Sequence, residues 1–208
     1  MNRHLIIPLA LALLPAALGA QERATTSSGR VVLLYPNGTW KYASPAVTPA
    51  SAGAGAAEHR RPASAVARLE FAHGKAALYY DPKIWQQAPS DEPGRLRLRH
   101  VDGDGYAVVI AERLEMSMDA LRDVALTNAR SAAPDARIVS QETRRVNGHD
   151  VMVMQIEGTI KTIRFIYLGY YYVGPEGTFQ LLTYTAANLF KEYRTPFEQL
   201  LDGFTLTP

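Results

Sequence analysis

The sequence predicts an α+β domain, an antiparallel β-sheet with helices packed against it, preceded by a small N-terminal β-hairpin and a flexible linker. Three observations carry this prediction. Short apolar and aromatic runs alternate with turn-forming residues through most of the chain, as expected of successive strands. Two longer segments instead repeat their apolar residues at helical spacing. Strands in succession with few helices favour an antiparallel sheet over alternating βαβ units.

The first 20 residues are typical of a secretory signal peptide. A basic start at Arg3 is followed by an apolar run over residues 5–18 and then by small residues, which is the order that export signals share. The apolar run is shorter than the roughly 20 residues that span a bilayer. We therefore expect residues 1–20 to be removed after Gly19 or Ala20, and the product to be periplasmic or secreted.

Composition excludes several classes of function. Without residues 1–20 the chain has 21 basic against 20 acidic residues, which argues against nucleic-acid binding because phosphate contacts require clustered positive charge. The chain has no cysteine, so disulfides, thiol nucleophiles and cysteine metal sites are excluded. Later apolar runs are all interrupted by charge or glycine, and no transmembrane segment is expected after signal cleavage.

Residues 21–43 are expected to form the hairpin segment. Apolar and aromatic residues of 31–42 flank a Pro-Asn-Gly turn at 36–38, which favours a β-hairpin. An isolated hairpin is marginal in water, so we expect Trp40 to anchor it on another surface. Residues 44–65 are mostly Ala, Pro, Ser and Gly, and such a composition predicts a disordered linker.

Residues 66–208 have the length of one domain. Leu96 and Leu98 alternate with arginines, which indicates a half-buried strand with the leucines inward. Asn147-Gly148 predicts a tight hairpin, and residues 162–173 are apolar on both faces, as in a central strand. Strands are expected at 68–72, 75–80, 95–101, 106–114, 137–146, 149–157, 162–173 and 178–185.

Two helices complete the domain. Ser117 is suited to be the N-cap of the first, which covers one face of the sheet. The C-terminal segment has large apolar residues at helical spacing over 189–204, but Pro196 interrupts it. We expect a break or kink near Arg194 and a new helix that ends at Asp202, since Pro is favoured at a first helical position.

This order of elements resembles the PsbP-like family of lumenal and periplasmic proteins, and the resemblance covers nearly all of residues 66–208. Its motifs are Tyr79-Tyr80-Asp81-Pro82 before Trp85, the helix after Ser117, Asn147-Gly148, Phe179-Gln180-Leu181, and Phe197 with Leu200-Leu201 and Phe204. The chain departs from the family at Lys83-Ile84 and in lacking a lipid-anchor cysteine. The resemblance implies an antiparallel sheet sandwiched by helices, and a non-enzymatic module that assists larger assemblies.

No local motif of catalysis is present. The chain has no nucleophile elbow, no zinc-protease helix and no phosphate-binding loop, which are the usual local signatures of hydrolases and nucleotide enzymes. The loop 102–105 has alternating aspartates but lacks the further ligands of a calcium loop. We therefore expect no catalytic residues, no metal and no cofactor. An envelope hydrolase is the least favoured hypothesis, because it requires a catalytic triad assembled without local motifs.

Two features suggest a binding surface. Arg95, Arg97 and Arg99 share one face of a strand and could meet an acidic partner, although a solvated face or pairing with Glu112 also explains them. Strand 162–173 carries a cluster of four tyrosines, at positions 167, 170, 171 and 172, and Tyr184 is expected on the neighbouring strand. Such a cluster suits recognition, although core packing explains it too. The candidate binding residues are Trp85, Tyr167, Tyr170, Tyr172, Arg95, Arg97 and Arg99.

The leading hypothesis is an exported, non-catalytic binding or assembly-accessory protein of the bacterial envelope, acting on a protein partner. The alternative is a carrier of a small apolar or lipid-like ligand, held between sheet and helices and lined by Trp85 and the tyrosines. The sequence identifies neither ligand, pathway nor oligomeric state.

Overall fold

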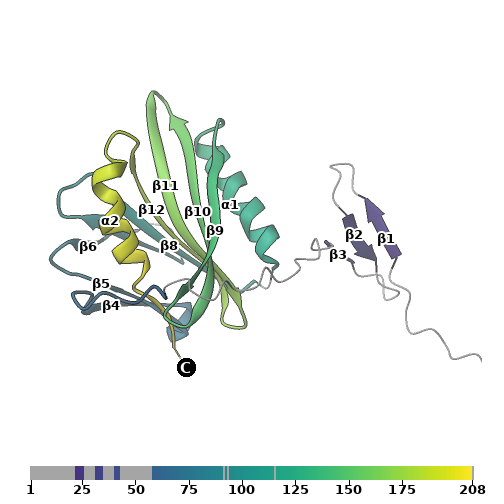
Figure 1. The fold of residues 1–208 in the computed structure, drawn as a ribbon, viewed down its shortest axis with the longest axis horizontal. Helices are drawn as coiled ribbons and strands as arrows, with labels where there is room; N and C mark the ends of the chain where they lie inside the picture. Colours follow the sequence, from purple (N-terminus) through teal and green to yellow (C-terminus); the bar gives the residue numbers. More distant parts are fainter. Residues whose placement is uncertain are drawn as a thin grey trace, which may run out of the picture. The chain divides into compact units, whose positions relative to one another are not determined.

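In the computed structural model the chain divides into two compact units, Met1–Ala50 and Ser51–Pro208 (Figure 1). The structure describes residues 58–207 apart from 91, 93 and 115, and also the backbone of three short strands in the first unit. The signal peptide expected at residues 1–20 lies outside the described residues, as does most of the linker expected at 44–65.

The first unit contains a three-stranded antiparallel sheet. Its strands are β1 (Glu22–Thr25), β2 (Val31–Leu34) and β3 (Trp40–Tyr42), in the order β1-β2-β3. Strands β2 and β3 pair as the predicted hairpin does, and β1 adds a strand that was not predicted. The side chain of Trp40 is outside the described residues, so its role as an anchor stays a prediction.

The second unit is built on a seven-stranded antiparallel sheet in the order β6-β7-β8-β12-β11-β10-β9. Neighbouring strands in this order are mostly consecutive in the chain, and β8 with β12 is the long-range pair. The strands are β6 (Trp85–Ala88), β7 (Arg95–His100), β8 (Tyr106–Glu112), β9 (Arg137–Val146), β10 (His149–Ile160), β11 (Ile163–Gly174) and β12 (Gly177–Ala186).

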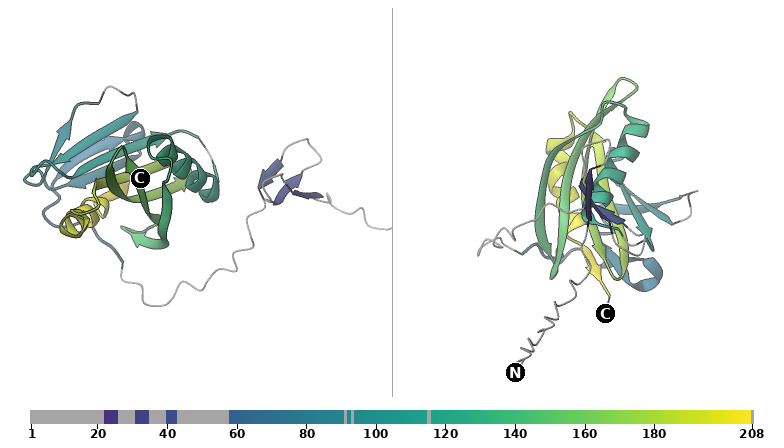
Figure 2. Two further views of the ribbon diagram at one scale, coloured as in Figure 1. Left: turned by 90° about the horizontal axis from the view of Figure 1, so that it is seen from above. Right: turned by 90° about the vertical axis from the view of Figure 1, so that its right-hand side faces the viewer.

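Different layers cover the two faces of this sheet (Figures 1 and 2). Helix α1 (Met118–Ala132) lies on one face, over β9, β10 and β11. Helix α2 (Phe190–Leu201) lies on the other face, together with a small antiparallel sheet in the order β13-β5-β4. The small sheet comprises β4 (Ala67–Phe71), β5 (Ala76–Tyr80) and β13 (Phe204–Leu206), and a short 3-10 turn, η1 (Ala72–Gly74), joins β4 to β5.

Alternation along the strands divides the core in two. On the α2 face, Phe179, Leu181 and Phe197 belong to a large aromatic cluster. On the α1 face, Leu121 and Met154 belong to a smaller cluster. Successive residues of a strand point to opposite faces, so a strand in the middle of this sandwich is apolar on both sides, as predicted for residues 162–173.

Local signals identified two boundaries correctly. The Ser117 hydroxyl accepts a 3.1 Å hydrogen bond from the Ala120 amide and caps α1 as predicted. Asn147 and Gly148 connect β9 to β10 with φ values of 46° and 85°. This left-handed pair is the turn that Asn-Gly favours in two-residue hairpins.

The prediction of a separate helix after a break near Arg194 is wrong. Helix α2 runs through Pro196 without interruption. An interior proline costs about 3 kcal/mol, whereas each large apolar side chain that becomes fully buried contributes roughly 1.5–3 kcal/mol. Tyr193 precedes the proline, and Phe197 and Leu200 follow it, and all three are buried in the same cluster. Packing on both sides of Pro196 therefore outweighs the missing hydrogen bond.

Strands β6 and β13 were not predicted. Each is only three or four residues long, and β13 pairs with β5, which lies more than a hundred residues earlier. Residues from Glu58 onward, assigned to the linker by composition, already contact the domain, since the His59 amide donates to the Arg145 carbonyl at 2.9 Å. Such non-local pairings have no signature in local composition.

Candidate functional site

A groove of about 510 Å³ opens on the α1 face of the large sheet. Helix α1 forms one wall, strands β11, β12 and β8 form the floor, and β7 forms the opposite rim. Helix α1 covers β9, β10 and β11. Strands β12 and β8 lie beyond the edge of the helix, so the sheet is open there. We call this space the α1 groove.

Small side chains on α1 make room for the groove. The wall is formed by Ala125, Asn128, Ala129, Ser131 and Ala132. Positions three, four and seven apart share one face of a helix, so these residues form one continuous stripe. Leucine-sized side chains in that stripe would fill the space above the floor, and the groove therefore depends on their small volume.

Three cross-strand rows run beneath and beside the groove, from β11 through β12 and β8 to β7. Each row ends at one arginine of β7, because the arginines occupy alternate positions. The rows are Tyr171, Gln180, Ile110, Arg95; then Gly169, Leu182, Val108, Arg97; then Tyr167, Tyr184, Tyr106, Arg99.

The third row contains three half-buried tyrosines whose rings contact one another. The ring centroids of Tyr106 and Tyr184 are 5.2 Å apart and nearly parallel, and those of Tyr167 and Tyr184 are also 5.2 Å apart. Burial raises the pKa of Tyr167 and of Tyr184 above the usual range of a phenol. Both therefore remain neutral near pH 7, with hydroxyls able to donate and accept hydrogen bonds.

Counted over the described residues, the arginine rim has more positive than negative groups. Glu92 pairs with Arg95 at 2.5 Å and with Arg97 at 2.8 Å, so one carboxylate faces two guanidinium groups. The expected alternative partner, Glu112, lies opposite Thr178 of β12 instead. All of these side chains are partly exposed, and their pairing is therefore weak and open to exchange for another anion.

Two polar residues of the floor are deeply buried. Gln180 is 3% exposed and Tyr171 is 1% exposed, and they lie opposite each other on β12 and β11. Burial raises the pKa of Tyr171 well above its usual value, which keeps the phenol neutral. Among the described residues neither side chain has a hydrogen-bond partner.

The structure distributes the predicted binding residues between two regions. Tyr167, Arg95 and Arg97 line the α1 groove, and Arg99 ends its tyrosine row. Trp85, Tyr170 and Tyr172 are buried in the cluster on the opposite face. Trp85 packs edge-on against His100, with ring centroids 5.3 Å apart, and so helps to close the core.

Sequence reasoning named Gln180 only as part of a family motif, and proposed neither Gln180, Leu182 nor Tyr106 as a site residue. The available signal was the amide of Gln180 between Phe179 and Leu181, in a strand otherwise composed of apolar, aromatic and β-branched residues. A polar side chain in a strand covered on both faces needs a partner.

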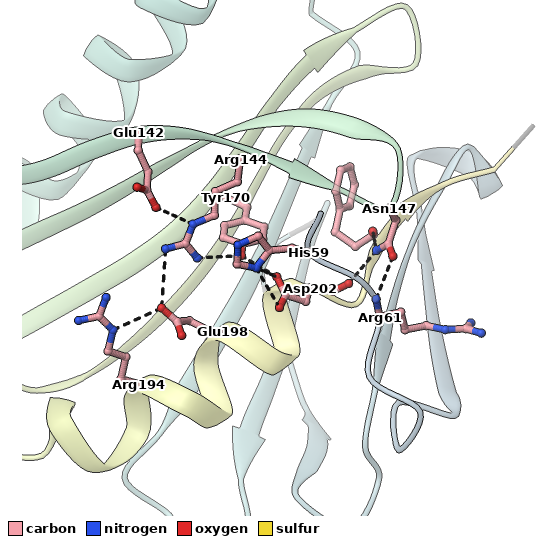
Figure 3. Close-up of polar contacts among 10 residues, drawn as sticks. His59, Arg61, Glu142, Arg144, Asn147, Tyr170, Arg194, Glu198 and Asp202 are labelled. Carbon is pink, nitrogen blue, oxygen red and sulfur yellow. Dashed lines mark hydrogen bonds and ion pairs between the residues drawn. The ribbon is translucent and has the colours of Figure 1, made fainter. Parts of the chain in front are cut away.

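A second polar region lies on the α2 face and is centred on Asp202 (Figure 3). The Tyr170 hydroxyl donates to Asp202 at 2.7 Å and accepts from Arg144 at 3.3 Å. His59 lies 3.3 Å from the same carboxylate, and Arg144 lies 3.8 Å from Glu198. We call these five residues the Asp202 cluster.

The Asp202 cluster joins segments that are far apart in the chain. The Asn147 side-chain amide donates to the carbonyls of Asp202 and Phe204, both at 2.7 Å, and its oxygen accepts from the Arg61 amide at 2.9 Å. The cluster thereby ties the β9–β10 turn to the end of α2 and to the segment that enters the domain. The side chains of the cluster bond one another, so these contacts hold the three segments together.

The described residues contain no group of three or more histidine, aspartate or glutamate side chains arranged to hold a metal ion.

Comparisons with known proteins support the fold. No protein-family model matches the chain, and no curated protein matches its sequence. Among solved structures, cyanobacterial PsbP from Synechocystis matches with a TM-score of 0.53 and 13% identity, over 70% of this chain and 95% of that protein.

Two further structures match with lower scores. A protein from Bacteroides thetaiotaomicron has a TM-score of 0.46 and 11% identity, over 67% of this chain and 47% of its own. A protein of unknown function from Pseudomonas aeruginosa has a TM-score of 0.43 and 12% identity, over 60% and 81%. The match to cyanobacterial PsbP and the arrangement of sheets and helices show that the second unit has a PsbP-like fold, as the sequence predicted.

Proposed function

We propose that this chain is an exported, non-catalytic binding or assembly-accessory protein of the bacterial cell envelope, and that the α1 groove is its binding site. The observation that carries the proposal is the convergence of the tyrosine row, the arginine rim and the small-residue stripe of α1 on one groove. Tyrosine and arginine are enriched at recognition surfaces. The resemblance to PsbP-like accessory proteins supports a binding role.

The N-terminal sequence supports export. Residues 1–20 follow the order of a signal peptide, as argued above. Within the described ranges, no helix is both long enough and apolar enough to cross a bilayer.

The test fills the groove and leaves the rest of the surface intact. Ala132 is exposed at the end of α1 and lines the groove, so Ala132→Phe places a ring in it. Thr127 is exposed on α1 and does not line the groove, so Thr127→Phe is the matched control. Immobilised mature protein is incubated with an extract of the native cell envelope, and the captured proteins are identified by mass spectrometry.

We expect wild type and Thr127→Phe to capture the same specific partner and Ala132→Phe to lose it, with equal melting temperatures for all three. Capture that survives Ala132→Phe would place the binding site elsewhere. Reproducible substrate turnover by wild type would overturn the non-catalytic assignment.

A second candidate is a carrier of a small apolar or lipid-like ligand. The volume of the groove favours it, since about 510 Å³ lies within the roughly 300–1,000 Å³ range of small-molecule sites. Native mass spectrometry of protein purified from its own host should then show a bound small molecule on wild type and Thr127→Phe. Its presence at equal occupancy on Ala132→Phe would exclude the groove as the carrier site.

A further inference from the structure

We propose that the α1 groove binds a small molecule with an apolar body, a polar group that hydrogen-bonds Gln180 and Tyr171, and a carboxylate that meets Arg95 and Arg97. This inference rests on the proposed function, because it takes the groove to be the binding site of the protein. It gives the chemistry of the second candidate above. Each part of the ligand corresponds to a different feature of the groove.

The polar group is matched by the buried pair on the floor. Gln180 and Tyr171 are at least nine-tenths buried and line the groove, yet neither has a hydrogen-bond partner among the described residues. A buried polar atom left without any partner costs about 1–3 kcal/mol. The described side chains contain no fully buried atom of that kind, so these polar atoms touch the groove. Their partner is therefore water in the empty groove, and a ligand that displaces this water has to replace its hydrogen bonds.

The fold itself does not require an amide at position 180. Phe179 and Leu181, on either side of it, supply the contacts of β12 with the opposite core. The next residue in the same cross-strand row is Ile110, and an apolar side chain is what a buried strand position favours. A glutamine at this place is therefore explained by what it faces, which is the groove.

The apolar body is matched by the middle of the floor. Leu182 and Val108, opposite each other on β12 and β8, form the middle of the floor. Ile156 and Phe165 add apolar surface on the side of α1. Small-molecule sites are mostly apolar, with a few polar groups that fix orientation, and this floor has that composition.

The carboxylate is matched by the rim. Among the described residues, Glu92 is the one carboxylate paired with Arg95 and Arg97, and guanidinium groups bind carboxylates through paired hydrogen bonds. Only β8 separates β12 from β7, so the floor amide and the rim lie about 10 Å apart at the usual strand spacing. The polar group and the carboxylate therefore belong at opposite ends of the ligand.

Three rigid probes test these requirements by calorimetric titration of the mature protein at pH 7. The first, 6-hydroxy-2-naphthoate, carries a hydroxyl and a carboxylate at opposite ends of a planar apolar ring. The second, 2-naphthoate, lacks the hydroxyl, and the third, 2-naphthol, lacks the carboxylate. We expect the first to bind about tenfold more tightly than either of the others, as the loss of one hydrogen bond or ion pair predicts.

Two variants test which residue of the groove binds each end of the first probe. Gln180→Met should weaken 6-hydroxy-2-naphthoate about tenfold and leave 2-naphthoate unchanged, since only the first uses the amide. Arg97→Gln should weaken both naphthoates and leave 2-naphthol unchanged. Arg113→Gln is the matched control for charge, because Arg113 is exposed and does not line the groove, and it should change none of the three affinities.

A structural role of Gln180 would give a different result. If the amide supported the fold, Gln180→Met would lower the melting temperature and weaken all three probes alike. We expect instead an unchanged or higher melting temperature together with selective loss of the hydroxylated probe. Equal affinity of the three probes for wild type, or no binding of any of them, overturns the ligand assignment. In that case, capture of a partner by wild type but not by Ala132→Phe would still support the proposed function. Capture that Ala132→Phe does not change would overturn the proposed function and the ligand assignment together.

Discussion

Tyr170 and Tyr171 are consecutive residues of β11 and are equally buried, but their hydroxyls lie in different environments. The Tyr170 hydroxyl points to the α2 face and contacts Asp202 and Arg144. The Tyr171 hydroxyl points to the α1 face and has no partner among the described residues. Burial alone therefore does not distinguish a polar group that supports the fold from one that is available to a ligand. The presence or absence of a partner does.

The same contrast extends to packing around the two regions. Near the Asp202 cluster, a Cβ atom at Gly203 would lie 1.9 Å from the backbone oxygen of Tyr79, whereas at Gly169 the nearest atom is the tip of the Leu182 side chain, at 2.7 Å. Backbone in a paired strand cannot move aside, whereas at Gly169 the obstacles are side chains: Leu182 can turn into the groove, and the Tyr171 ring, 2.9 Å from the added atom, must shift slightly.

The largest expected effect tests this difference with matched substitutions. Gly203→Ala should destabilise the protein by about 3 kcal/mol, the upper end for overpacking, and Gly169→Ala by about 1 kcal/mol. Urea unfolding of both variants and of wild type measures the two losses. Equal losses would show that the groove side of the sheet is packed as rigidly as the side of the Asp202 cluster.

The next effect concerns the carboxylate at the centre of the Asp202 cluster. Asp202→Ala removes the acceptor of Tyr170 and of His59, and should cost about 2 kcal/mol because partly buried partners lose their bonds. Asp150→Ala is the control, since its ion pair with Arg145 is exposed and should contribute under about 1 kcal/mol. Similar losses in thermal unfolding would show that the cluster is as weak as a surface pair.

A smaller effect compares the two tyrosines directly. Tyr170→Phe leaves Asp202 and Arg144 each short of one hydrogen bond, and should cost about 1 kcal/mol at pH 7. Tyr171→Phe removes a hydroxyl that bonds no described residue, and should change stability by less than about 0.5 kcal/mol. A larger loss from Tyr171→Phe than from Tyr170→Phe would reverse the assignment of structural and available groups.

The two tyrosines should respond alike to alkaline pH. Burial raises the pKa of both, and the Asp202 carboxylate raises that of Tyr170 further. A raised pKa means that the folded state holds its proton longer than the unfolded state, so the stability it contributes is present below about pH 10 and is lost as pH rises. Near pH 11 each Tyr→Phe variant should lose about 1 kcal/mol less stability than wild type does.

Chemical denaturation at pH 7 and at pH 11 measures this difference, with Tyr79→Phe as the control for a tyrosine on the small sheet. A variant that loses as much stability as wild type would show that the replaced phenol titrates normally in the folded protein.

Much of the fold followed from local pattern. The alternation of Leu96 and Leu98 with arginines gave the correct inward face of β7, and Asn147-Gly148 gave the correct turn. Pro196 led to a prediction of two separate helical segments, because proline has a low helix propensity, whereas tertiary packing stabilises one helix through it. Strand β13 was missed because three residues carry too little periodicity to identify a strand.

The sequence identified only some of the residues of the candidate site. Tyr167 and the arginines at positions 95 and 97 were proposed from two separate features, and Trp85 was expected beside them. Alternation along a strand assigns a residue to a face, but which residues share a row depends on how distant strands pair and in what register. The pairing of β8 with β12 brings the arginines and the tyrosines to the same groove and leaves Trp85 on the opposite face.

The sequence by itself predicted an export signal from the order of basic, apolar and small residues. It determined the antiparallel α+β class and the inward face of β7, because these depend on periods of two or four residues that neighbours in the chain carry. Only the tertiary structure decided that Gln180 and Tyr171 lie side by side without partners, and that small residues of α1 leave a space above them. A cavity and a missing hydrogen bond are relations between residues far apart in the chain, and no local pattern of the sequence records them.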